Sequence, residues 1–146
     1  MVHTEKTRFL AKLIIYLISA HTAIYVLNNY AHGKIDMFYV WAEYTPIILI
    51  FCLVPLAAIL FLSTHLARQA SVVLLGILAA ELIYNIYTRF AASTSFSVRE
   101  PALLWKIFYE GSFGMMLVLE VIASWLAFNL LREIHKHLSP SSENPS

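Results

Sequence analysis

Four long apolar runs divide this chain, and each is about as long as a helix that crosses a lipid bilayer. The runs cover about residues 9–27, 46–64, 71–90 and 111–131. A hydrocarbon layer about 30 Å thick needs about 20 helical residues, because a helix rises about 1.5 Å per residue. The sequence therefore predicts an all-α fold. We expect an integral membrane protein whose single domain, residues 1–138, is an antiparallel bundle of four transmembrane helices.

The overall composition also favours lipid over water. Of the 146 residues, 60% are apolar and only 13% are charged, whereas soluble domains are about 45–50% apolar and about 25% charged. The same composition excludes a disordered chain, which is poor in apolar groups. A formal net charge of +1 from scattered cations gives no basic face for nucleic acid. We therefore expect the lipid bilayer as a partner and no nucleic acid.

The connections between the runs predict how the spans are joined. Residues 65–70 form a short link, which predicts a tight antiparallel hairpin of the second and third spans. Thr45 is placed to cap the second span, with Pro46 as its first helical residue. Residues 139–146 are polar and rich in serine and proline, so we expect a disordered tail.

The stretch before the fourth run carries a signal for the start of a helix. Ser97–Glu100 has the spacing of a capping box, and Pro101 follows it. We therefore expect a short interfacial helix before the last span. In this prediction Trp105, Phe108 and Tyr109 lie toward lipid.

Lysine and arginine near the span ends favour one orientation across the membrane. With both termini inside, the inner face carries Lys6, Arg8, Lys12, Arg68, Arg132 and Lys136, and the outer face carries Lys34, Arg89, Arg99 and Lys106. Cytoplasmic loops carry the excess of these cations in membrane proteins. We therefore expect a multi-pass protein of the cell (inner) membrane with both termini in the cytoplasm.

Three ionisable residues interrupt the apolar runs: His21, Glu81 and Glu120. Ionisable side chains are costly in hydrocarbon unless they are paired or hydrated, so those within spans indicate a functional site. Counting along the helices puts the three residues about 18, 15 and 16 Å from the inner edge of the bilayer. All three are therefore predicted to lie near the midplane.

Polar neighbours at helical spacing extend this pattern into two stripes. The stripes are Glu81, Asn85 and Arg89 on the third span, and His21, Tyr25 and Asn28 on the first. Residues four apart lie on the same face of a helix, and both stripes run from the midplane toward the outer face. If they face each other, they line a polar cleft that opens outward.

We expect this cleft to bind a small ligand, a lipid headgroup or a coupling ion or proton. The expected roles are a protonatable centre (Glu81 and Glu120), a proton partner or ligand (His21), orientation of the ligand (Asn85 and Tyr25) and attraction of anionic groups at the mouth (Arg89). The same polar groups would also serve to fix helix packing through hydrogen bonds.

Two further classes of function stay open. In an accessory or assembly subunit of a larger membrane complex, the buried charges would pair with helices of a partner. A membrane enzyme of lipid or quinone chemistry would need little more than a buried carboxylate and a cation. The sequence indicates no catalytic residue, and it leaves a homo-oligomer open.

The positions of the histidines constrain cofactor chemistry. Haem between spans needs two imidazoles at one depth, but His65, His135 and His137 fall at the inner edge, about 18 Å from the depth of His21. This spacing argues against haem. His21 and the two carboxylates are ligand types suited to zinc or iron, but their spacing requires no metal and we predict none.

Overall fold

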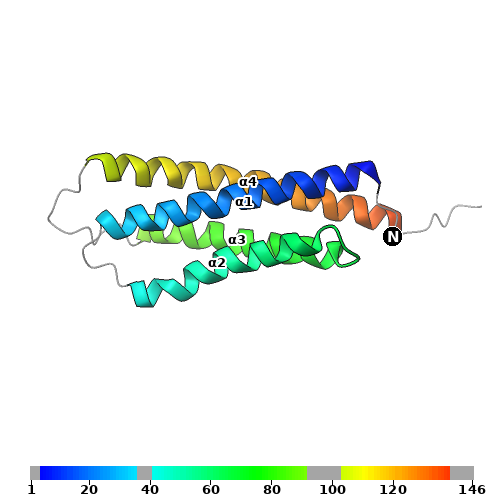
Figure 1. Ribbon diagram of the computed structural model, residues 1–146, viewed down its shortest axis with the longest axis horizontal. Coiled ribbons are helices and arrows are strands. Elements are labelled where there is room, and N and C mark those ends of the chain that lie inside the picture. Colours follow the sequence, from blue (N-terminus) through cyan, green and yellow to red (C-terminus); the bar gives the residue numbers. More distant parts are fainter. Residues whose placement is uncertain (1–3, 36–40, 92–102, 139–146) are drawn as a thin grey trace, which may run out of the picture.

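The computed structural model describes residues 4–35, 41–91 and 103–138, and the regular secondary structure within these residues is all α-helix. The helices are α1 (Glu5–Ile35), α2 (Trp41–Phe61), α3 (Ala67–Ala91) and α4 (Leu103–Leu138). Figure 1 shows all four lying along the long axis of an elongated bundle. The predicted capping box before the fourth span and the predicted disordered tail lie outside the described residues.

Three of these helices have described segments long and apolar enough to cross a membrane: Glu5–Lys34, Ala67–Tyr87 and Leu103–His137. In α2 the corresponding apolar segment, Thr45–Phe61, is shorter. Large apolar side chains also point outward, as Leu60, which is 72% exposed, illustrates. Such a surface is typical of lipid contact and not of a soluble monomer, which indicates a membrane protein.

Contacts at three levels hold α1 against α4. The Lys6 Nζ atom lies 2.9 Å from Glu133 Oε1, and Asn28 Nδ2 donates a hydrogen bond of 2.9 Å to Ser112 Oγ. Between these levels His21 meets Glu120. The two helices therefore run in opposite directions, and the start of α1 lies beside the end of α4 (Figure 1).

The ends of the helices differ from the predicted span boundaries for local reasons. α2 begins at Trp41, so Pro46 lies inside the helix and Thr45 is not its cap. A proline this close to a helix start removes only one backbone hydrogen bond. α3 begins at Ala67 because Thr64 stabilises the turn before it, where its hydroxyl accepts a hydrogen bond from the Leu66 amide at 3.1 Å.

The prediction of a separate interfacial helix is wrong. α4 runs without interruption through Gly111 for 36 residues, or about 54 Å. One glycine costs a helix only about 1 kcal/mol, and aromatic contacts hold the first turns of α4 on α1. Trp105 lies against Tyr30 with ring centroids 5.8 Å apart, and Tyr109 stacks on His32 at 5.3 Å. These two rings therefore face the bundle, whereas Phe108 is exposed as predicted.

Two groups of buried apolar side chains fill the interior. The large apolar cluster includes Ile14, Ile18, Leu74, Leu78, Ala123 and Leu130, among others. The small apolar cluster comprises Tyr25, Phe51, Cys52 and Met116. His21 on α1 and Glu120 on α4 each lie between the residues that contribute to the large apolar cluster and those that contribute to the small one. The ionisable groups therefore lie between two apolar layers.

Candidate functional site: a buried His–Glu–Glu centre

The periodicity of α1 directs His21 into the bundle. Ile14, Ile18, His21 and Tyr25 follow one another at intervals of three or four residues, and all four are buried. Such intervals keep side chains on one face of a helix. His21 is 0% exposed, so the apolar residues on both sides fix its inward direction.

The same periodicity brings two carboxylates to this level from other helices. On α3, Leu74, Leu78 and Glu81 form one buried face, and Glu81 is 0% exposed. On α4, Glu120 follows the buried Met116 and is 1% exposed. The three residues that the sequence predicts at one depth are therefore all buried at one level of the bundle.

The three side chains meet there, and we call them the His–Glu–Glu centre. His21 Nε2 lies 3.3 Å from Glu120 Oε1 and 3.5 Å from Glu81 Oε1. One nitrogen or oxygen atom from each residue lies within 4.8 Å of the corresponding atoms of the other two. Residues far apart in the sequence thus form one compact cluster across three helices.

Asn85 supports one carboxylate of the centre. Its Nδ2 atom donates a hydrogen bond of 2.9 Å to Glu120 Oε1, and the side chain is buried. Because Asn85 lies one turn after Glu81 on α3, this hydrogen bond links the third and fourth helices beside the cluster. Asn85 therefore positions Glu120, whereas the sequence predicted that Asn85 orients the ligand.

Several polar atoms of the centre make no hydrogen bond within the described part of the chain. They are His21 Nδ1, both carboxylate oxygens of Glu81, and Glu120 Oε2. A buried polar atom without a partner costs about 1–3 kcal/mol, and buried carboxylates cost more when they carry charge. A bound proton or metal ion would therefore stabilise the centre, because it would bring positive charge to these carboxylate oxygens.

The distances also suit a metal ion. Two ligands about 2.0–2.1 Å from a tetrahedral zinc ion lie about 3.4 Å apart, close to the 3.3 and 3.5 Å found from His21 Nε2 to the two carboxylates. Imidazole nitrogen and carboxylate oxygen are usual ligands of zinc and iron. The three residues could hold such an ion, which their spacing in the sequence did not indicate.

The other predicted site residues have different positions. Tyr25 is buried beside the centre, with its ring centroid 6.1 Å from that of His21 and an edge contact to Phe51. Asn28 hydrogen-bonds α4 at the Tyr109 carbonyl and the Ser112 hydroxyl, which sequence periodicity alone could not reveal. The side chain of Arg89 lies outside the described residues.

His21 and Glu81 therefore join the stripes of α1 and α3 at the level of the centre, where Glu120 on α4 completes the cluster. Asn28 and Asn85, farther along the two stripes, hydrogen-bond α4 instead. Above and below this level the two apolar clusters cover it. Comparison with known proteins adds no relative: no family model, no curated protein and no solved structure matches this chain.

Proposed function

We propose that this chain is an integral membrane protein, an antiparallel bundle of four transmembrane helices that binds a coupling cation at the His–Glu–Glu centre. The observation that carries the proposal is the meeting of His21, Glu81 and Glu120, fully buried, with ligand atoms within 4.8 Å. The orientation that we propose has both termini in the cytoplasm, as the lysines and arginines favour.

Charge decides which cations fit this centre. With a neutral imidazole and two ionised carboxylates, the cluster carries a charge of −2 in a region of low dielectric constant, which is costly. Two bound protons make the cluster neutral, and so does one divalent metal ion. Binding a divalent ion with release of two protons leaves the net charge unchanged, so the two occupied states can exchange at low electrostatic cost.

The burial of the centre favours a small occupant. His21, Glu81 and Glu120 are each at most 1% exposed, so a proton or a single ion fits this position better than a lipid headgroup or a larger ligand. The ligand set, one imidazole and two carboxylates, favours zinc or iron among divalent ions. Glu81 and Glu120 would exchange the protons, and His21 would act as ligand or proton partner.

The contacts of the three ionisable groups favour a site belonging to this chain over the role of an accessory subunit. In an accessory subunit we would expect buried charges to be directed at a partner's helices. Here the three groups are directed at one another, with His21 Nε2 3.5 Å from Glu81 Oε1 and 3.3 Å from Glu120 Oε1.

Metal binding to the full-length protein in detergent tests the proposal. We expect one zinc ion per chain after treatment with a chelator and addition of zinc, with release of up to two protons to an indicator dye. Glu81→Gln and Glu120→Gln should each weaken binding by more than about 100-fold, because loss of a residue that only supports a ligand already costs about 10–100-fold.

Glu110→Gln is the matched control, because Glu110 lies exposed on the same helix as Glu120. It should leave the affinity for zinc unchanged. If zinc does not bind but Glu81→Gln alters the dependence of stability on pH, the centre binds protons alone. If neither zinc binding nor this pH dependence is found, the proposal is wrong.

A further inference from the structure

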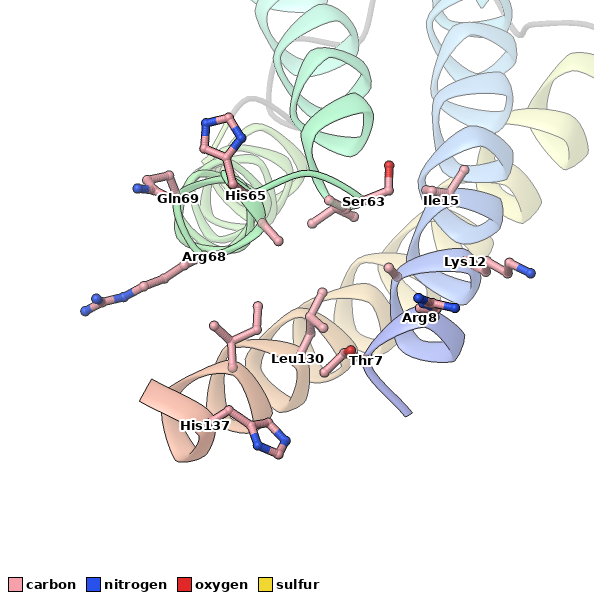
Figure 2. Close-up of a pocket in the computed structure, with 14 residues that line it drawn as sticks. Thr7, Arg8, Lys12, Ile15, Ser63, His65, Arg68, Gln69, Leu130 and His137 are labelled. Carbon is pink, nitrogen blue, oxygen red and sulfur yellow. The ribbon is translucent and has the colours of Figure 1, made fainter. Parts of the chain in front are cut away.

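A second site lies at the end of the bundle where α1 begins and α4 ends. It is a cavity of about 740 Å³ between the first turns of α1, the α2–α3 connection with the start of α3, and the last turns of α4. Figure 2 shows Thr7, Ser63 and Leu130 approaching it from these three sides. The cavity is separate from the His–Glu–Glu centre, none of whose residues lines it.

Positive charge gathers on the cavity wall. Arg8 and Lys12 line it from α1, and Arg68 lines it from α3. His65 and His137 add two imidazoles, and none of the described lining residues is acidic. In Figure 2 the side chains of Lys12 and Arg68 extend away from each other, on opposite sides of the cavity.

The nearby acidic residue Glu133 does not cancel this charge. Its Oε1 atom lies 2.9 Å from Lys6 Nζ and 3.0 Å from Lys136 Nζ, two cations that do not line the cavity. Arg8, Lys12 and Arg68 therefore keep a positive potential around the cavity, and this potential attracts an anionic group.

The interior of the cavity is apolar. Leu62, Leu130 and Ile134 line it and are buried parts of the large apolar cluster. Phe9 and Phe61, each next to a lining residue in the sequence, are exposed. A molecule that fits both parts has an anionic phosphate group joined to apolar chains.

We propose that this cavity binds the headgroup of an anionic phospholipid, with Arg8, Lys12 and Arg68 supplying the positive charge that attracts its phosphate. Basic pockets between helices at a membrane surface recognise such headgroups, and arginine pairs well with phosphate oxygens. A free phosphate ion shares the charge, but it would leave the apolar part of the cavity unused. The lipid is therefore the occupant that both parts of the cavity favour.

The inference depends on insertion of the helices in a membrane and not on the His–Glu–Glu centre. Recovery of the chain in carbonate-washed membranes tests insertion by itself. Glu81→Gln should bind anionic lipid as the unsubstituted protein does. If the cation site is wrong, zinc binding fails while lipid is still retained. If the lipid site is wrong, lipid retention fails while zinc still binds.

Native mass spectrometry of the full-length protein with added lipid is the test. We expect phosphatidylglycerol to be retained in preference to phosphatidylcholine. Arg68→Gln should weaken retention of phosphatidylglycerol about fivefold, and Arg8→Gln with Arg68→Gln about 25-fold, since each cation near an anionic surface contributes about that factor. Excess inorganic phosphate should not displace the lipid.

Arg132→Gln is the matched control, because Arg132 is an exposed arginine near the same end of α4 that does not line the cavity. It should leave retention unchanged. Equal retention of the two lipids, equal losses for Arg68→Gln and Arg132→Gln, or displacement by inorganic phosphate would each overturn the lipid assignment.

Discussion

At the scale of single residues, the two buried carboxylates differ in their hydrogen bonds. Glu81 has two oxygens without a hydrogen-bond partner in the described chain, whereas Glu120 Oε1 accepts a hydrogen bond from Asn85. The two glutamates are therefore not equivalent. Substitution of Glu81 should affect stability mainly through charge, and loss of Asn85 should affect the position of Glu120.

Glu81→Gln should make the metal-free protein more stable while abolishing zinc binding. The variant removes one of two like charges from a buried position, so we expect a higher free energy of unfolding at neutral pH. With one titratable group fewer in the centre, the stability of the variant should also change less with pH. Thermal unfolding after chelation, followed across pH, measures both effects. A loss of stability at every pH would contradict this account.

Asn85→Ala should weaken zinc binding without removing a ligand. The hydrogen bond from Asn85 fixes the Glu120 carboxylate, and loss of such supporting contacts costs about 10–100-fold in metal affinity. Asn129→Ala is the control, because Asn129 donates to the Trp125 carbonyl within its own helix. Titration with zinc compares the two variants, and equal affinities would remove Asn85 from the site.

At the scale of helices, the length of α4 depends on its contact with α1. The first turns of α4 bear exposed apolar residues such as Leu103 and Ile107, and the sequence by itself suggests that this part lies along the membrane surface. Asn28, which donates to the Tyr109 carbonyl and the Ser112 hydroxyl, ties these turns to α1 instead.

Asn28→Ala should loosen the first part of α4. We expect amide hydrogen exchange to accelerate over residues 103–112, because two hydrogen bonds between helices are lost, while exchange near Leu130 stays unchanged. Exchange followed by mass spectrometry resolves the two regions. Unchanged exchange over residues 103–112 would show that the aromatic contacts suffice to hold them.

Two small residues on α3, Gly76 and Ala80, face outward. Gly76 and Ala80 are spaced for close helix contact, yet both are exposed, and a Cβ atom at Gly76 would meet nothing within 4 Å. Gly76→Ala should therefore stabilise an isolated chain by about 0.5–1 kcal/mol. Thermal unfolding measures this change, and a lower stability together with loss of an oligomer would place Gly76 in a contact between copies.

At the scale of the whole molecule, the number of membrane crossings decides the topology. Three helices have described segments long enough to span a bilayer, and the shorter apolar segment of α2 decides between three crossings and four. The contact of Lys6 with Glu133 brings the beginning of α1 and the end of α4 to one end of the bundle, as an even number of crossings requires.

Labelling with a membrane-impermeant maleimide tests this number. In a Cys52→Ser background, which removes the buried native thiol, Glu5→Cys and Lys136→Cys should react from the same side of the membrane. The excess of lysine and arginine predicts the cytoplasmic side. Reaction from opposite sides would mean an odd number of crossings and would contradict the four-span bundle.

The sequence by itself determined the helices and the depth of the ionisable groups. Apolar run length and helical periodicity are local properties, so they identified most of α1, α3 and α4 and put His21, Glu81 and Glu120 at one level. The expected start of α2 was wrong because Pro46 is tolerated inside the helix, which begins at Trp41. The separate interfacial helix was wrong because contacts with α1 hold the first turns of α4 in line.

Only the tertiary structure decided which faces meet. The rotation of each helix about its axis depends on packing against the other helices, and no local pattern records it. That rotation brings His21 Nε2 to within 3.5 Å of both carboxylates and gathers Arg8, Lys12 and Arg68 around one cavity. Depth thus followed from counting residues along each helix, whereas the contacts that make a site followed from how the four helices pack.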